Sequence, residues 1–163
     1  MKGIEFLEKQ IKDGIVIGVR GNEYTQDLRD GNVWAVVGWS GDMFQLKAES
    51  EGKFDFAIAE EGGMIANDNL MIPSTATNNA GAEKLINYYY DPVIAAKVAA
   101  FVNYVCPVKG AQEELAKIDS ELAQSEFIFP TDKTNSQLKI FRALTAAEET
   151  KFQTAFQSVA GNA

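Results

Sequence analysis

A continuous apolar run of strand length, residues 33–39, constrains the fold of this chain more than any other feature. The run reads Val-Trp-Ala-Val-Val-Gly-Trp and lacks the alternating polar residues of a strand with one solvent-exposed face. Such a run is typical of a strand covered on both faces, as in a parallel sheet with helices on each side. Three further short apolar runs are predicted as strands, at residues 15–17, 54–59 and 70–72.

Helices are predicted around these runs from apolar residues at helical spacing and from capping residues. Asp91 followed by Pro92 marks the start of one helix, and Thr145 with Glu148 forms a capping box at the start of the last long one. The predicted helices cover residues 4–11, 43–50, 82–89, 92–105 and 111–118, a further helix capped by Asp119, and the last helix after Thr145. Residues 24–30 are predicted as a short polar helix or a turn that ends at Gly31. The helix after Asp91 is predicted to bury Ile94, Val98, Phe101, Val102 and Val105, and the last helix Phe152, Phe156 and Val159.

Strands that alternate with helices indicate an α/β fold. Three or four strands are few for a complete doubly wound sheet, which leaves two interpretations. The chain is either a small α+β domain or part of a larger α/β protein, and we expect the second. The chain also opens inside a predicted helix without a cap, and its first residues lack the pattern of a secretory signal.

The chain is acidic and contains no histidine. Fifteen Lys and Arg residues stand against 23 Asp and Glu residues, which gives a net charge of -8. This charge disfavours binding to nucleic acid or anionic membranes, which need a basic face, and fits a cationic ligand. The absence of histidine removes the commonest general base and metal ligand, and Cys106 is the single cysteine. We therefore expect a protein that is not an enzyme, with no catalytic residue, no cofactor and no metal.

A turn at residues 38–42, Gly-Trp-Ser-Gly-Asp, follows the long apolar run and precedes a predicted helix. Open α/β sheets bind ligands at such turns, beyond the carboxyl ends of the strands. The serine hydrolase motif G-x-S-x-G occupies the same position, but its last residue is replaced here by Asp42, and no histidine is present to activate Ser40. For this turn alone, the preferred interpretation is Trp39 in the core and Asp42 as a helix N-cap.

Two more positions complete a possible ligand site. Asp68 lies in an acidic connection with paired glycines, residues 60–69, where calcium binding is conceivable although the spacing matches no EF-hand loop. A solvated acidic loop is the alternative. Tyr104 stands near the end of a predicted helix. Together with Trp39 and Asp42, these residues offer the aromatic faces and carboxylates that a slender organic cation needs.

These residues stand within an ordered series of short motifs. The motifs are NEYTQDL at 22–28, GNVW at 31–34, GWSGD at 38–42, EEGGM at 60–64, DN at 68–69, IP at 72–73, NY at 87–88, DP at 91–92 and YVCPVKG at 104–110. Each motif alone is weak, but the series is specific and covers nearly the whole chain. In this series the chain resembles the extracytoplasmic solute-binding proteins of polyamine ABC transporters, the spermidine/putrescine type.

The resemblance implies a periplasmic-binding-protein type II-like α/β fold, of which this chain is the C-terminal half of a two-lobed protein. In this interpretation residues 1–64 complete lobe two, residues 65–112 return to lobe one, and residues 113–163 form C-terminal helices that pack back on lobe two. The resemblance also implies an extracytoplasmic location, in the periplasm or as a cell-surface lipoprotein, although the chain carries no signal peptide. The implied partners are spermidine or putrescine and an ABC permease in the membrane.

The resemblance assigns ligand contacts position by position. Trp39 and Asp42 match a W-x-G-D pair that contacts the ligand, Asp68 matches a carboxylate near the hinge that meets an amine, and Tyr104 matches a tyrosine that lines the cleft. Two residues before that aspartate the family usually has an aromatic ring, and this chain has Ala66.

The function implied is that of a polyamine-binding component of an ABC transporter, which captures spermidine or putrescine between carboxylates and rings for uptake. Two alternatives are open: a non-binding truncated remnant, and a half-protein that needs a separately encoded first half. Within the binding class, another cationic amine is the nearest rival ligand.

Overall fold

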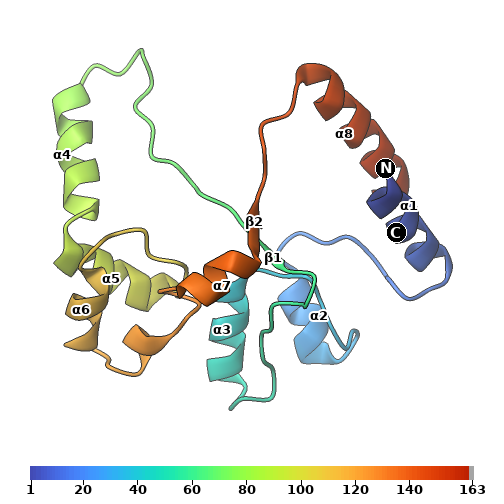
Figure 1. Ribbon diagram of the computed structural model, residues 1–163, viewed down its shortest axis with the longest axis horizontal. Coiled ribbons are helices and arrows are strands. Elements are labelled where there is room, and N and C mark those ends of the chain that lie inside the picture. The colour runs from blue at the N-terminus through green and yellow to red at the C-terminus, as the bar shows by residue number, and fades with distance from the viewer. Residues whose placement is uncertain (162–163) are drawn as a thin grey trace. The chain divides into compact units, whose positions relative to one another are not determined.

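A computed structural model describes residues 1–161 and combines helices with a small parallel sheet (Figure 1). This mixed α/β content agrees with the predicted class. The elements, in chain order, are α1 (Lys2–Lys12), α2 (Tyr24–Asp30), α3 (Ser40–Glu49), β1 (Gly63–Ile65), α4 (Asn79–Tyr89), α5 (Pro92–Val102), α6 (Ala111–Ala116), the 3-10 helix η1 (Leu122–Gln124), α7 (Asp132–Gln137), β2 (Leu138–Ile140) and α8 (Ala146–Ala160).

The chain divides into two compact units. The first contains residues 1–36 and the chain from Arg142 on, so it is built from both ends of the sequence, and the second contains residues 37–141. All four predicted ligand contacts, Trp39, Asp42, Asp68 and Tyr104, belong to the second unit. The predicted boundaries at residues 64 and 112 concern the lobes of a whole two-lobed protein, and they stay a prediction.

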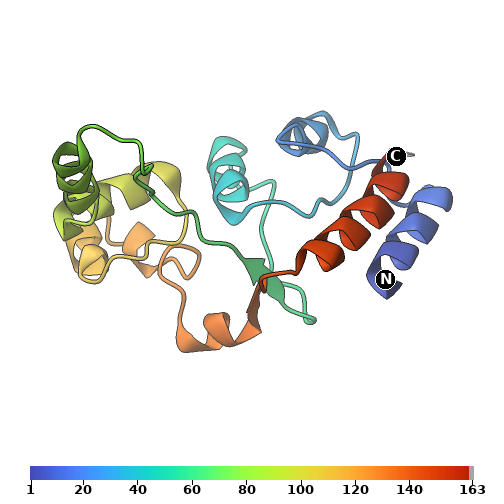
Figure 2. The same ribbon diagram turned by 90° about the horizontal axis from the view of Figure 1, so that it is seen from above.

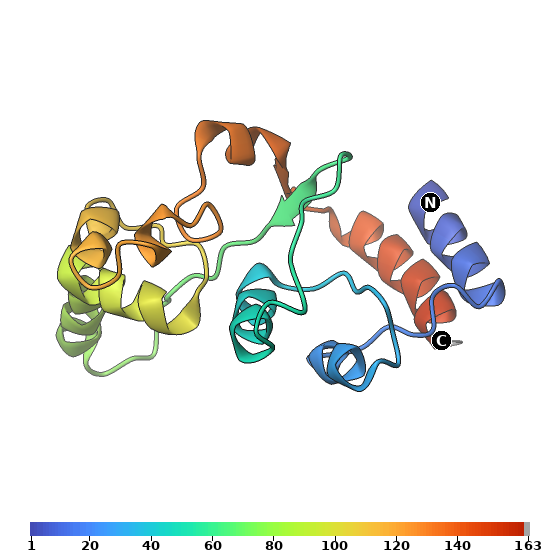
Figure 3. The same ribbon diagram turned by 90° about the horizontal axis from the view of Figure 1, so that it is seen from below.

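In the first unit, α1 and α8 lie side by side, as Figures 1, 2 and 3 show from three directions. Val159 of α8 is buried and lines a small hollow with Ile11 and its neighbours on α1. The predicted apolar stripe of α8 is wrong at Phe152 and Phe156, which are 38% and 41% exposed. The periodicity correctly gives a helix with an apolar face, but α1 covers only part of that face within this unit.

The core of the second unit lies where α5, α6 and η1 meet. Ala96 of α5, Leu115 of α6 and Ala123 of η1 form a buried cluster. The predicted N-cap of α5 is confirmed, because the Asp91 carboxylate accepts hydrogen bonds from the first-turn N–H groups. The predicted buried face of α5 is wrong at Phe101, which is 83% exposed, and at Val105, which is exposed beyond the end of the helix. The other three predicted residues are half-buried, and the fully buried side chains of α5 are alanines. Alanines let two helices approach closely, which the larger residues on the other face would prevent.

None of the four runs predicted as strands forms a strand in the part of the chain that the structure describes. Residues 15–17, 33–39, 54–59 and 70–72 are irregular, and within the long run Trp34 and Val37 are almost fully exposed. A strand requires a hydrogen-bonded neighbour as well as an apolar sequence, and no neighbour pairs with these runs. Phe56 nevertheless packs edge-on against the Phe127 ring, with the ring centres 5.1 Å apart.

The strands that do form, β1 and β2, were not predicted. They pair in parallel, with Gly63 opposite Leu138 and Ile65 opposite Ile140. The chain enters β1 through Gly62, whose φ of +103° is open to glycine and unfavourable for other residues. A Cβ on Gly62 would also collide with the carbonyl oxygen of Gln137. The close approach of the two strands therefore depends on this glycine.

The start of α8 confirms the predicted capping box. Thr145 Oγ1 accepts a hydrogen bond from the Glu148 N–H at 3.3 Å, and the Glu148 carboxylate accepts one from the Thr145 N–H at 2.9 Å. The Arg142 guanidinium adds a second partner, with Nη2 2.7 Å from Oε1 of Glu148. Arg142 and then Thr145 lower the pKa of the Glu148 carboxyl from about 4.5 to about 2.

We predict that Glu148→Gln reduces the loss of folding stability that the protein undergoes at acid pH. A carboxyl whose pKa is lowered by folding stabilises the native state above its unfolded pKa, and this stabilisation is lost as the pH falls from about 4.5 to about 2. Urea unfolding at pH 7 and pH 3 should therefore show a smaller loss of stability in the variant than in the wild type. Glu149→Gln removes a charge from the same helical turn and serves as the control. Equal losses in wild type and Glu148→Gln would contradict the prediction.

Candidate functional site

The N-terminal turn of α3 carries two of the four predicted ligand contacts. Trp39 is the N-cap residue, and its carbonyl oxygen accepts a hydrogen bond from the Met43 N–H at 3.2 Å. Asp42 lies in the first turn, where the exposed N–H groups of a helix end favour negative charge. The interpretation of Trp39 as core and Asp42 as N-cap is wrong, since Trp39 is 52% exposed and itself holds the cap position.

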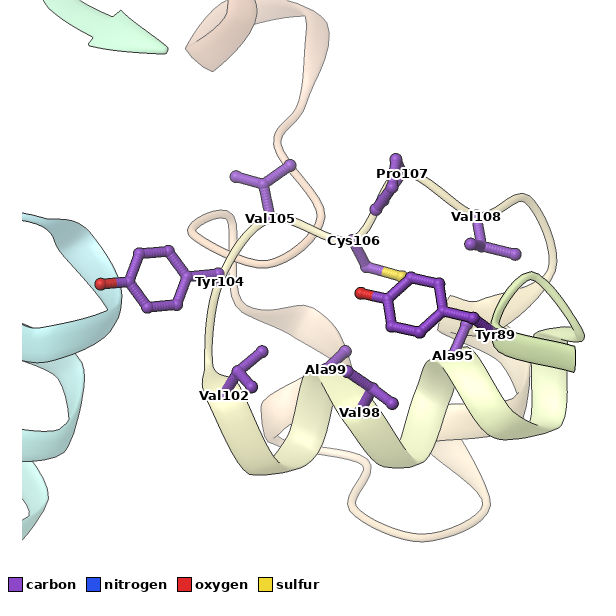
Figure 4. A pocket seen from close by; sticks show the side chains of 10 residues that line it. All are labelled: Tyr89, Ala95, Val98, Ala99, Val102, Tyr104, Val105, Cys106, Pro107 and Val108. Atoms are coloured by element: carbon purple, nitrogen blue, oxygen red, sulfur yellow. The ribbon is translucent and has the colours of Figure 1, made fainter. Parts of the chain in front are cut away.

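Tyr104 reaches this turn from the segment that follows α5. Its hydroxyl donates a hydrogen bond to Oδ1 of Asp42 at 2.7 Å, and both side chains are partly buried. Figure 4 shows the Tyr104 ring directed towards α3 and away from the other labelled side chains. Hydrogen bonds to a carboxylate are shorter and stronger than those between neutral groups. The structure thus brings Asp42 and Tyr104 together, with Trp39 on the same helical turn as Asp42.

The end of α5 explains how Tyr104 comes to face α3. The C-cap residue Asn103 adopts the left-handed conformation, with φ 58° and ψ 27°, which asparagine tolerates better than most residues. The chain then reverses and residues 104–108 run back over α5 (Figure 4). Beyond Tyr104, the Cys106 N–H anchors this segment by donating to the carbonyl oxygen of Ile128 at 2.9 Å.

A small apolar cavity lies behind Tyr104, between α5 and the returning segment (Figure 4). Its volume is about 20 Å³, room for about one water molecule. Tyr89 of α4 and the free thiol of Cys106 help to line it. A polyamine does not fit in such a space, so this cavity is not the candidate ligand site.

Asp68 lies on a different segment of the chain from the other predicted ligand contacts. It is exposed, on the irregular segment between β1 and α4, and the neighbouring Ala66 is exposed as well. Among the described residues, no hydrogen bond or ion pair joins Asp68 to Trp39, Asp42 or Tyr104. Its membership of the site stays a prediction.

Gly41 lies in the same turn as Trp39 and Asp42, and its role is not apparent from the sequence. It is buried, although its neighbours Ser40 and Asp42 are only partly so. The covering group is the Tyr104 ring, which lies against the glycine Cα. A glycine next to a motif aspartate is the only sign of this contact in the sequence, and it does not reveal which ring approaches.

Two kinds of feature are absent from residues 1–161. No three histidine, cysteine, aspartate or glutamate side chains gather there in a way that could hold a metal ion. Nor does that part of the chain contain a helix with the length and apolar character needed to cross a bilayer.

We predict that Tyr104→Phe destabilises the protein by about 1 kcal/mol. Hydrogen bonds to charged groups contribute about 1.5–3 kcal/mol, and the partial exposure of this pair reduces that figure. The midpoint of urea unfolding, followed by circular dichroism, should fall accordingly. The control is Tyr88→Phe, which removes a hydroxyl from a ring that is 60% exposed. If both variants shift the midpoint equally, the hydrogen bond to Asp42 contributes nothing specific.

Comparison with known proteins identifies the class of this chain. Residues 2–126 match the family of bacterial extracellular solute-binding proteins, and the chain belongs to that family. The resemblance described from the motifs is thereby confirmed at the level of the family.

Several curated relatives of this chain are named as binding proteins for putrescine, cadaverine or spermidine. The chain is 27% identical over 132 residues to the putrescine/cadaverine-binding protein of Pseudomonas aeruginosa, covering 78% of this chain and 36% of the relative. It is 26% identical over 122 residues to the putrescine-binding periplasmic protein of Escherichia coli, covering 72% and 32%. It is 31% identical over 105 residues to the spermidine/putrescine-binding periplasmic protein of Escherichia coli, covering 64% and 29%. The chain thus spans about a third of the length of the curated relatives that it matches.

Proposed function

We propose that this chain is part of a polyamine receptor that captures spermidine or putrescine between carboxylates and aromatic rings. The observation that carries the proposal is the hydrogen bond between Tyr104 and Asp42, with the half-exposed Trp39 ring on the same turn of α3. The relatives are named as binding proteins for putrescine, cadaverine and spermidine, and their names support the choice of ligand.

The chemistry of the turn suits an alkylammonium ion. Asp42 offers a carboxylate for charge-assisted hydrogen bonds from an ammonium group. Trp39 and Tyr104 offer rings, whose faces attract cations and cover methylene groups. The net charge of -8 adds a general attraction for a polycation. Nothing in this arrangement requires a reaction, so we assign binding and not catalysis.

We further propose that Asp68 joins the site in the ligand-bound protein. A polyamine carries an ammonium group at each end, and one carboxylate on α3 satisfies only one of them. Asp68 is exposed on a segment without helix or strand, so it is available to a second ammonium group. Ala66 replaces the ring expected beside Asp68, which leaves that end of the site without an aromatic wall.

The wider assignment rests on the family. In this proposal the chain belongs to the C-terminal half of a two-lobed, type II-like receptor, with residues 1–64 in lobe two, 65–112 in lobe one and 113–163 returning to lobe two. The receptor works outside the cytoplasm and delivers its ligand to an ABC permease in the membrane. Two of the three relatives described above are named as periplasmic proteins, which supports this location.

A second candidate is a chain that does not bind polyamines by itself, either as a truncated remnant or as a half that needs a separately encoded first half. The observation in its favour is the exposure of large apolar side chains, such as Trp34, Met71 and Phe141. Such groups are normally covered in a complete domain.

A thermal melt with and without spermidine tests the proposal. The chain is heated in the presence of millimolar spermidine, and sodium chloride at matched ionic strength is the control for charge screening. A ligand that binds only the native state raises its melting temperature. A cooperative transition that shifts upward only with spermidine supports the proposal. A cooperative transition whose melting temperature does not change with spermidine contradicts the proposal and supports the second candidate. A melt without cooperativity does the same.

Asp42→Asn and Asp68→Asn should each weaken spermidine binding by about tenfold or more, because each removes a charged partner of an ammonium group. Isothermal titration calorimetry measures the effect. The matched control is Asp132→Asn, which makes the same change in net charge at an exposed position in the first turn of α7. If a variant binds spermidine with the affinity of this control, the residue that it changes is not part of the site.

Ala66→Trp should strengthen binding about twofold to fivefold, because it restores a ring beside Asp68 and a cation–π contact contributes about 0.5–1 kcal/mol at an exposed site. Ala66→Leu adds apolar volume without a ring and is the control. An unchanged affinity in the tryptophan variant would show that the ligand does not pass over position 66.

A further inference from the structure

The Tyr104 ring packs directly onto the backbone of Gly41. A Cβ built on Gly41 would lie 2.7 Å from Cζ of Tyr104, and closer still to Cε2 and Cδ2 of the same ring. Side-chain atoms do not approach a Cβ so closely, so no other amino acid fits at position 41 while the ring keeps its place. Gly41 is buried for the same reason.

The backbone of Gly41 does not require glycine. Its φ lies outside the left-handed region, and it occupies an ordinary helical position, the second residue of α3. Gly3 is the second residue of α1, and a Cβ on Gly3 would meet nothing within 4 Å. The two glycines occupy the same place in a helix, and only Gly41 is in contact with a ring. The three heavy atoms nearest to a Cβ at position 41 all belong to Tyr104, so the requirement for glycine comes from this ring.

The contact also fixes where the Tyr104 hydroxyl lies. The ring rests on residue 41, and its hydroxyl donates to the carboxylate of the next residue, Asp42, at 2.7 Å. A ring moved away by a methyl group on residue 41 would carry the hydroxyl away from Oδ1 of Asp42. The position of the carboxylate is thus coupled to the absence of a side chain at Gly41.

We propose that Gly41 is a positioning residue of the ligand site: it seats the Tyr104 ring on α3 so that the hydroxyl holds the Asp42 carboxylate in the orientation that binds a ligand ammonium group. This inference rests on the proposed function for its ligand, but its geometric part concerns Gly41 and Tyr104 alone. Gly41 does not touch the ligand in this proposal and acts through Tyr104.

The first measurement needs no ligand. Gly41→Ala should lower the midpoint of urea unfolding, whereas Gly3→Ala should leave it unchanged or raise it, because alanine is the better helix former. In a Tyr104→Ala background the ring is gone, and Gly41→Ala should then cost nothing. In a Tyr104→Phe background the ring remains, and the loss should persist. A Gly41→Ala chain that fails to fold and is rescued by Tyr104→Ala supports the same conclusion.

The second measurement is the affinity for spermidine, by calorimetry on the folded variants. Gly41→Ala and Tyr104→Phe should each weaken binding by about tenfold, and the double variant should be no weaker than either, because both changes remove the same hydroxyl from Asp42. A merely structural role for Gly41 would lower the unfolding midpoint and leave the affinity of the folded protein unchanged.

The outcomes separate the two proposals. If Gly41→Ala behaves like Gly3→Ala, or costs the same stability with and without the Tyr104 ring, the positioning role is overturned whatever the ligand. If the wild type does not bind spermidine, the proposed function is overturned, and a stability loss that depends on the ring still supports the seating of Tyr104 by Gly41. Affinity losses that multiply in the double variant overturn the claim that Gly41 acts through Tyr104.

Discussion

The hydrogen bond from Tyr104 to Asp42 is the interaction on which the candidate site depends, because it joins the start of α3 to the segment that follows α5 across 62 positions of sequence. Three local features make it possible: the left-handed turn at Asn103, the missing side chain at Gly41, and the first-turn position of Asp42. Each of these is weak alone. Together they bring a carboxylate and two aromatic side chains to one helical turn.

The predictions from sequence succeeded where a structure is determined by neighbouring residues. The N-cap at Asp91, the capping box at Thr145 and Glu148, and the end of α2 at Gly31 were all predicted correctly, because each involves only a few consecutive residues. Strands were not predicted correctly. An apolar run such as residues 33–39 becomes a strand only beside a partner, and a single sequence does not say which partner is present. The same limit explains the wrong prediction for the buried face of α5. Its alanines are buried because α6 packs against them, and the spacing of apolar residues along α5 does not reveal that neighbour.

The residues of the candidate site were predictable from the sequence, but the contacts between them were not. Residue type and motif order indicated Trp39, Asp42, Asp68 and Tyr104 as contacts for a cation, and the family is confirmed. The sequence does not contain the distance between Asp42 and Tyr104, because long-range contacts depend on how the chain reverses at Asn103. Nor does it reveal that Gly41 lies under a ring, since that role is defined by a residue remote in sequence.

The parallel pairing of β1 with β2 has a consequence for the order in which the chain folds. It joins residue 63 to residue 138, and contacts between distant residues require the closure of a long loop, which slows their formation. The α5–α6 contact, by contrast, links neighbouring helices and can form locally. During synthesis the ladder cannot form until β2 has left the ribosome, so the helical core has time to assemble first. Residues 63–65 lack their partner during that interval, so their backbone hydrogen-bonding groups are open to pairing with another chain.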